Sequence, residues 1–135
     1  IIRPTALANR EDSRVEVTVE GTHADEKLEI GIGLTRLPDE VYFADALNGI
    51  MGSWGLQKPE IGRIGMGVIF PSNHFIRFDE QPAEHRVVLR CEAGKPLTYY
   101  IQSRWLKGLR FSCCPSAQDW GDVLRLKAKQ IATGQ

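Results

Sequence analysis

Alternation of hydrophobic and polar residues runs through most of the chain and predicts a fold built mainly of β-strands. The first clear case lies at residues 15–19, where Val15, Val17 and Val19 alternate with polar residues. A second run covers residues 28–34, in which every second residue is leucine or isoleucine. Successive side chains of a strand point to opposite faces, so each run predicts a strand with one buried face. We expect the two strands to pair as antiparallel neighbours.

Further segments have strand character. Residues 64–70 alternate apolar side chains with glycine up to a proline that ends the run. Residues 75–78 predict either a short edge strand or a loop clamp. Residues 86–91 form a short apolar run, and residues 96–106 alternate again after the turn-forming segment 92–95. The last two strands are therefore expected to form a hairpin.

Residues 38–60 break the alternation and leave two interpretations open. Asp39 could cap a short helix, whereas the β-branched and aromatic residues at 41–43 fit a strand equally well. The loop that follows carries Trp54, which predicts either a plug at the edge of the core or a stacking platform for a ligand. The glycines of the 28–34 run leave room on one strand face for another layer of the fold or for a ligand.

One amphipathic helix is predicted near the carboxyl end. Ser116 followed by Asp119 resembles a capping box. Helices do not alternate with the strands, so parallel βαβ architecture is not expected. We predict a single mainly β domain over residues 1–135, an antiparallel β-sandwich or supersandwich-like pair of sheets with one C-terminal helix. Apolar residues recur after the cap at helical spacing, namely Trp120, Val123, Leu124, Leu126 and Ile131.

Composition and charge narrow the possible partners. Acidic and basic residues balance at 17 each, so no net field attracts nucleic acid, and none is expected as a partner. No apolar run approaches the length of a membrane helix, and no membrane partner is expected. Residues 1–12 show neither period, and we interpret them as a lead-in that docks on a neighbouring element. The chain begins with Ile1, which suggests a processed product or a piece of a longer protein.

Metal and cofactor chemistry has little support in the sequence. No phosphate-binding loop, dinucleotide fingerprint, nucleophile elbow or zinc-protease motif occurs, and we expect no cofactor and no metal. Cys91, Cys113 and Cys114 lack metal-binding spacing, so they are buried thiols, or Cys91 pairs with one of its two counterparts. Generic groups of possible metal ligands are His23 with Asp25, and His74 and His85 with Asp79 and Glu84.

The strand at residues 96–106 carries the most distinctive side chains. One of its faces presents Thr98, Tyr100, Gln102 and Arg104, the composition of a sugar-binding or acidic-ligand surface, although a solvated sheet face would look the same. Arg104 could bind a carboxylate while Tyr100 donates a proton or stacks on a sugar. The candidate catalytic residues are Tyr100 and His85, and the candidate substrate-binding residues are Trp54, Arg104 and Gln102.

The order of these motifs resembles a known family. It is similar to the carboxyl-terminal part of a bacterial domain family of unknown function found in loci for the use of pectin and other acidic polysaccharides. The resemblance implies a carbohydrate ligand that contains uronic acid and a periplasmic or extracellular location, but no catalytic residues. Its most specific piece is the strand Gly94-Lys95-Pro96-Leu97-Thr98-Tyr99-Tyr100, followed by Trp105-Leu106-Lys107-Gly108 and Trp120.

Three functions follow as hypotheses. The first is action on, or binding of, acidic polysaccharide fragments, for which an enzyme needs a concave pocket with a perturbed acid or base. The second is a non-catalytic carbohydrate-binding module in which Trp54 and Tyr100 stack on sugars. The third is a structural or interaction domain that assembles with another copy or with missing residues, burying the strands between Val15 and Leu34.

Overall fold

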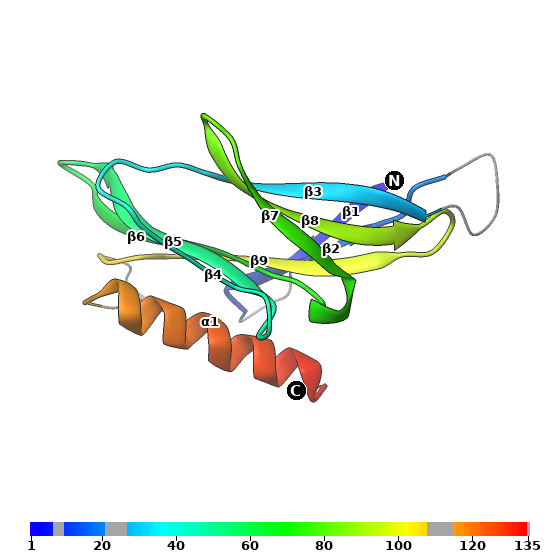
Figure 1. The fold of residues 1–135 in the computed structure, drawn as a ribbon. Coiled ribbons are helices and arrows are strands. Elements are labelled where there is room, and N and C mark those ends of the chain that lie inside the picture. Colours follow the sequence, from blue (N-terminus) through cyan, green and yellow to red (C-terminus); the bar gives the residue numbers. More distant parts are fainter. Residues whose placement is uncertain (7–9, 21–26, 108–114, 135) are drawn as a thin grey trace.

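The computed structural model describes residues 1–6, 10–20, 27–107 and 115–134 of the chain (Figure 1). The described part is mainly β, with two antiparallel sheets and one helix near the carboxyl end, which confirms the predicted fold class. A 3-10 turn, η1 (Ser72–His74), precedes β7. The other elements are β1 (Ile2–Ala6), β2 (Asp12–Val17), β3 (Lys27–Thr35), β4 (Val41–Asp45), β5 (Ile50–Lys58), β6 (Gly62–Ile69), β7 (Phe75–Glu80), β8 (Glu84–Glu92), β9 (Leu97–Trp105) and α1 (Ala117–Ala132).

The elements form three layers, with the larger sheet in the middle. This sheet, which we call sheet A, has the order β1-β2-β9-β6-β5-β4, and the smaller sheet B has the order β3-β8-β7. Sheet B covers one side of sheet A and helix α1 lies along the other (Figure 1). Sheet A therefore has a sandwich side and a helix side, and both sides bury hydrophobic residues.

The predicted pairing of the strands at 15–19 and 28–34 is wrong. β2 pairs with β1 and β9 in sheet A, whereas β3 pairs with β8 in sheet B. The two strands have compatible patterns because each buries alternate residues in the sandwich. Ile32 and Leu34 face inward from sheet B, and Val15 is buried on sheet A. Alternation fixes which face is buried but not which strand lies alongside.

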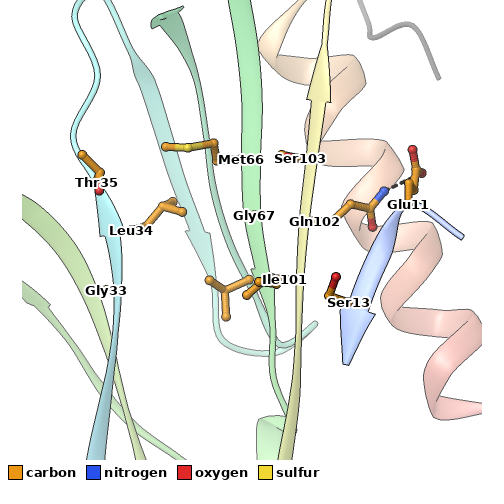
Figure 2. Close-up of a pocket in the computed structure, with 11 residues that line it drawn as sticks. Glu11, Ser13, Gly33, Leu34, Thr35, Met66, Gly67, Ile101, Gln102 and Ser103 are labelled. Carbon is orange, nitrogen blue, oxygen red and sulfur yellow. Dashed lines mark hydrogen bonds between the residues drawn. The ribbon is translucent and has the colours of Figure 1, made fainter. Parts of the chain in front are cut away.

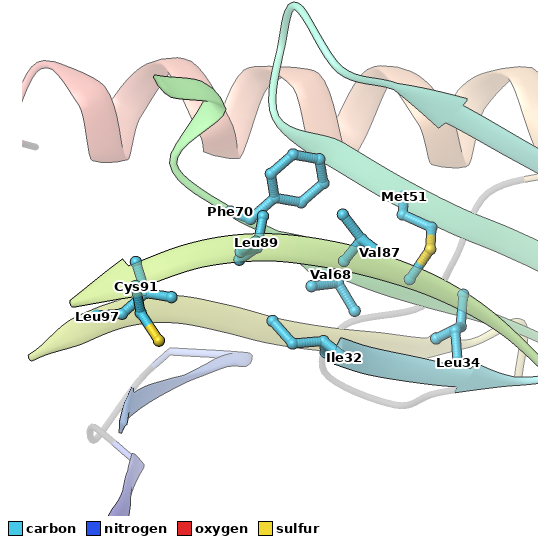
Figure 3. Close-up of a cluster of buried hydrophobic side chains, with 9 residues drawn as sticks. All are labelled: Ile32, Leu34, Met51, Val68, Phe70, Val87, Leu89, Cys91 and Leu97. Carbon is cyan, nitrogen blue, oxygen red and sulfur yellow. The ribbon is translucent and has the colours of Figure 1, made fainter. Parts of the chain in front are cut away.

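The predicted hairpin of residues 86–91 and 96–106 is also wrong. Its first strand belongs to sheet B and its second to sheet A, so the turn between them crosses from one layer to the other. Cys91 and Leu97, at the two sides of this turn, meet in the same hydrophobic cluster (Figure 3). Gly94 adopts a φ of 79° in the turn, a conformation that favours glycine. The two strands thus face each other across the core instead of pairing edge to edge.

Glycines on the helix side of sheet A let α1 approach the backbone closely. A Cβ atom built at Gly65 would lie 2.6 Å from ring atoms of Trp120, and one built at Gly67 would lie 2.6 Å from methyl carbons of Leu124. Trp120 and Leu124 are fully buried at this contact. The Trp120 indole also donates a hydrogen bond of 3.1 Å to the carbonyl of Met66. The glycine pattern of β6 is therefore a docking surface for the helix.

The glycines of β3 have a different role. A Cβ atom at Gly31 would meet the side chain of Arg86, and one at Gly33 would meet the carboxylate of Glu84. Both side chains come from the neighbouring strand β8 and pair with each other across its outer face. The space above these glycines is therefore filled by side chains of the same sheet. Neither of the two occupants considered, another layer of the fold or a ligand, is needed to explain them.

The remaining segments resolve the open interpretations. Residues 41–45 form strand β4, so Asp39 caps no helix and lies in a turn with a φ of 52°. Residues 2–6 form the edge strand β1, which docks on β2 by backbone pairing, so the lead-in contains a regular strand although its sequence shows no period. Residues 75–80 form the edge strand β7 of sheet B, which confirms the edge-strand interpretation.

The predicted helix is confirmed at its start. The Ser116 hydroxyl accepts a hydrogen bond from the Asp119 amide at 3.2 Å, as an N-cap does. Leu126 departs from the predicted apolar stripe, because it is 58% exposed. Within the described ranges, no helix has both the length and the apolar character needed to cross a bilayer.

The cysteines are settled in part. Cys91 is a buried free thiol rather than half of a disulfide, and burial raises the pKa of its thiol. Cys113 and Cys114 lie outside the described residues, as do His23 and Asp25 of one suggested ligand group.

Candidate functional site

The structure separates the two candidate catalytic residues. Tyr100 lies on the helix side of sheet A, where it packs against the cluster that contains Trp120. His85 lies on β8 in sheet B and is 3% exposed. Sheet A stands between the two layers. Tyr100 and His85 therefore cannot act on one substrate in a common site.

Trp54 occupies the core rather than a surface. It is 4% exposed and belongs to the cluster between β5 and α1, with Trp120 and Leu124. Its ring is covered by the helix, so a sugar could reach it only if α1 moved away. The structure thus places Trp54 as a plug, one of the two roles the sequence left open.

Gln102 and Arg104 line a cavity beside the helix, as two of the candidate substrate-binding residues. The cavity has a volume of about 300 Å³, at the lower end of the range typical for small-ligand sites. It opens between the end of β9, the residue that precedes β2, and one side of α1. We call it the Arg104 cavity, and its lining residues are Glu11, Gln102, Arg104, Val123, Leu126, Lys127 and Gln130.

Glu11 holds both polar residues of β9 in this cavity. The Arg104 guanidinium donates two hydrogen bonds to the Glu11 carboxylate, one of them from Nε to Oε2 at 2.5 Å. The Gln102 amide nitrogen donates to Oε1 of the same carboxylate at 2.5 Å. The paired fork of guanidinium and carboxylate is the strong, directional form of this interaction. Arg104 is therefore held in one orientation in the free protein.

The other polar atom of Gln102 has no partner. Gln102 is 4% exposed, and its Oε1 is buried without a hydrogen bond from any described residue. A buried acceptor of this kind carries a free-energy cost unless a donor reaches it. Gln102, which lines the Arg104 cavity, thus keeps one unused acceptor.

Lys127 connects the Arg104 cavity to a second ion pair network. Its Nζ lies 3.4 Å from Oδ1 of the buried Asp12. Asp12 also pairs with Arg10, whose Nη2 lies 2.6 Å from Oδ2. Burial opposes ionisation of Asp12, but the hydrogen bond from Arg10 and the charge of Lys127 outweigh it, so the pKa of this carboxyl is lowered. Arg10, Arg104 and Lys127 against Glu11 and Asp12 leave one positive charge in excess. The local field therefore favours an anionic ligand.

Tyr100 lines a second cavity on the same side of sheet A. It has a volume of about 380 Å³ and lies by the carboxyl end of α1. The other polar side chains around it carry hydroxyl or amide groups, and Ile69, Phe70 and Ile131 contribute apolar surface. No charged side chain lines it among the described residues. We call it the Tyr100 cavity, with Asn48, Ser72, Asn73 and Thr98 as its further polar lining.

A third hollow lies between the two sheets. This cleft of about 330 Å³ opens between β3 on one side and β6 and β9 on the other (Figure 2). Leu34, Met66 and Ile101 make most of its wall apolar. Figure 2 also shows the Gln102 side chain bonded to Glu11 beyond β9, away from Leu34 and Met66. Gln102 and Glu11 also border this cleft, whereas Tyr100 and Arg104 do not.

His85 is the buried centre of a polar cluster that reaches the surface at Glu80, whose side chain is 51% exposed. Its Nε2 lies 2.5 Å from Oε1 of Glu40 and its Nδ1 lies 2.7 Å from Oε2 of Glu80. The ring stacks on Tyr42 with centroids 3.7 Å apart. Arg36 donates to Glu80 at 2.5 Å. Both ring nitrogens are engaged, so His85 has no free nitrogen with which to act on a substrate.

The hydroxyl of Tyr42 is the unsatisfied member of this cluster. It is buried without a hydrogen-bond partner among the described residues, as is the hydroxyl of Ser53 on the neighbouring strand. Burial, followed by the negative charge of Glu80, raises the pKa of Tyr42 to about 12.

The described residues contain no group of three or more side chains arranged to hold a metal ion.

The chain as a whole matches a known family. Residues 3–134 match the sequence profile of a family described as Domain of unknown function (DUF4861), and the chain belongs to that family. Membership of a domain family of unknown function, as the motifs suggested, is confirmed at that level. No curated protein and no solved structure matches the chain significantly.

Sequence reasoning missed the partners that complete each cluster. Glu11 lies in a segment without periodicity, and Lys127 is a helix residue for which no role in a site was predicted. Glu40 and Tyr42 fall in the stretch for which helix and strand remained open. One signal was present for Glu11, since it directly precedes the alternating strand that pairs with β9.

Proposed function

We propose that this domain binds an acidic oligosaccharide along the helix side of β9, with a uronic acid unit in the Arg104 cavity. The observation that carries the proposal is the buried, unpartnered Oε1 of Gln102, a residue that lines the same cavity as two cationic side chains, Arg104 and Lys127. A sugar hydroxyl donates to this oxygen, while the carboxylate of the same unit interacts with the cations. A uronic acid supplies both groups on one ring.

The geometry of Arg104 suits a carboxylate. A guanidinium offers parallel N–H donors that match the two oxygens of a carboxylate. Glu11 already uses this arrangement in the free protein. The excess positive charge of the surrounding network favours an anion further and would speed its approach at low ionic strength.

The Tyr100 cavity accommodates a neighbouring unit of the same ligand. Tyr100 and Arg104 are four residues apart on one strand face, which corresponds to about 13 Å along the strand. The aromatic ring and the amide and hydroxyl groups of this cavity suit an uncharged sugar. The ligand would therefore follow β9 with its acidic unit at Arg104.

Binding is a better account of this surface than catalysis. No carboxylate or histidine lines the Tyr100 cavity among the described residues, and His85 lies in another layer. An acid or base that could assist Tyr100 is thus not part of the described cavity. The link to pectin and other acidic polysaccharides, and a periplasmic or extracellular location, belong to the same proposal.

The test is calorimetric titration of the folded protein with oligogalacturonides and with their methyl esters, which lack the charge. We expect binding of the acids, and at least a tenfold rise in Kd when Arg104 is replaced by alanine. Arg90→Ala is the matched control, because Arg90 is an exposed arginine of sheet B, and it should leave Kd unchanged. Absence of heat with every acid, or equal affinity of Arg104→Ala, would contradict the proposal.

A further inference from the structure

The carboxylate of Glu11 occupies the position that an acidic ligand would take. It accepts two hydrogen bonds from Arg104 and one from Gln102. Arg104 is also one of the two cations that the proposed function assigns to the carboxylate of the ligand. The side chain of Glu11 is 11% exposed, that of Arg104 is 23% exposed, and both line the Arg104 cavity. A ligand in this cavity would therefore touch the ion pair of Glu11 and Arg104.

We propose that Glu11 is a specificity-determining residue, an internal carboxylate that holds the place of the ligand's carboxylate and is exchanged for it on binding. The inference rests on the proposed function of the Arg104 cavity. It assigns selection for anionic ligands to a competition between two carboxylates for one guanidinium.

The exchange discriminates by charge. A ligand that brings its own carboxylate replaces Glu11 without leaving Arg104 unpaired. An uncharged ligand that displaces Glu11 leaves a largely covered guanidinium without a counter-ion, which is costly. Uncharged sugars are thus disfavoured because their binding would remove the counter-ion of Arg104. This is selection against the wrong partner.

The position of Glu11 in the chain allows the exchange. The ladder between β2 and β9 begins at the pair of Asp12 and Gln102, so Glu11 lies just outside it. Its side chain can leave Arg104 without breaking a strand pairing. Asp12, the next residue, stays fixed by Arg10 and Lys127, so the rest of the strand keeps its place.

The decisive variant is Glu11→Gln, which keeps the size and one acceptor oxygen but removes the charge. Because the competitor is weaker, we expect its affinity for oligogalacturonides to rise about tenfold. The affinity for the methyl esters should change by less, so the preference for the acid increases. Glu16→Gln is the control for net charge, since Glu16 lies on β2 outside the cavity lining, and it should leave Kd nearly unchanged.

Opposite results are equally clear. Weaker binding of the acid by Glu11→Gln would show that Glu11 orients Arg104 for the ligand, and would overturn the exchange. An equal gain in Glu16→Gln would reduce the effect to net charge and overturn it as well. If Glu11→Gln does not fold, as judged by circular dichroism, Glu11→Asp keeps the charge on a shorter side chain and should give a smaller gain in the same direction.

The two proposals fail in different ways. Wild-type protein that binds no acid refutes the proposed function, and the exchange with it. Wild-type protein that binds acids through Arg104, but is not improved by removal of the Glu11 charge, refutes the exchange alone.

Discussion

The two sides of sheet A are covered by different elements, and this difference decides where a ligand can bind. On the sandwich side, sheet B lies over the strands, buries the His85 ring and leaves a largely apolar cleft. On the helix side, the contacts of α1 with sheet A are concentrated on β5 and β6. The strip at β9 and β2 is left with the Arg104 and Tyr100 cavities.

The comparison indicates that similar polar groups have different roles under sheet B and beside helix α1. In both places nitrogen groups meet carboxylates: His85 lies between Glu40 and Glu80, and Arg104 pairs with Glu11. The His85 ring is buried against Tyr42 and both of its nitrogens are engaged, so we infer that its pairing contributes to the fold. Around Arg104 a cavity and an unpartnered acceptor remain, so the pairing is open to exchange.

The largest effect is expected from His85→Ala. Removal of the ring leaves the carboxylate of Glu40, which is mostly buried, without its partner, and breaking a pair of this kind costs about 3 kcal/mol. Urea unfolding should show this loss, while the Kd of the folded variant for oligogalacturonides stays at the wild-type value. His74→Ala is the control, since this ring makes one bond, to the carbonyl of Arg90. A loss under about 1 kcal/mol for His85→Ala would remove the distinction between a closed and an open cluster.

A smaller effect is expected from Gly65→Ala on the helix side. The new methyl group would lie 2.6 Å from Trp120 ring atoms, so α1 must shift, at a cost of about 1 to 3 kcal/mol. Gly31→Ala is the matched control, because its new methyl group meets a flexible arginine side chain, that of Arg86. The measurement is the unfolding midpoint in urea for both variants. Equal midpoints would show that close contact of the helix with sheet A is unimportant.

The smallest effect at neutral pH is expected from Tyr42→Phe. The lost hydroxyl is buried without a partner, so its removal should be nearly neutral or stabilising. In alkaline solution the sign is fixed by the pKa, which rises from 10.0 to about 12 in the folded protein. Because the folded protein holds this proton more tightly than the unfolded chain, the stability linked to protonation of Tyr42 is fully present below pH 10 and is lost as the pH rises through 12. The melting temperature should therefore fall less steeply between pH 9 and 12 for Tyr42→Phe than for the wild type. Parallel plots of melting temperature against pH would contradict the raised pKa.

Strands were more predictable from the sequence than their buried faces or their neighbours. Alternation at 28–34 identified a strand and the side it buries, because the period of two is a local property. At 96–106 it identified the strand, but Ile101 and Trp105 on the apolar face are exposed, whereas Gln102 on the polar face is buried. It did not show that β3 pairs with β8 or that β9 pairs with β2 and β6, since many strands share the same pattern. Pairing depends on contacts between distant residues, for which one sequence offers no signal.

The candidate site shows the same limit. Gln102 and Arg104 were predicted as polar residues of one strand face, and the structure places them together in one cavity. Their partners Glu11 and Lys127 come from other elements and carry no motif of their own. Trp54 illustrates the reverse case, because a tryptophan in a glycine-rich stretch is compatible with both core and surface until the position of α1 is known.

Glu11 and Arg104 are 93 positions apart in the chain, which has a consequence for how the protein folds. Contacts of such long range close large loops and tend to form late. The strand pairs joined by short turns, such as β5 with β6, close small loops and can form early. During refolding, the proposed binding surface should therefore be among the last parts to mature, so ligand-binding competence would lag behind the recovery of secondary structure.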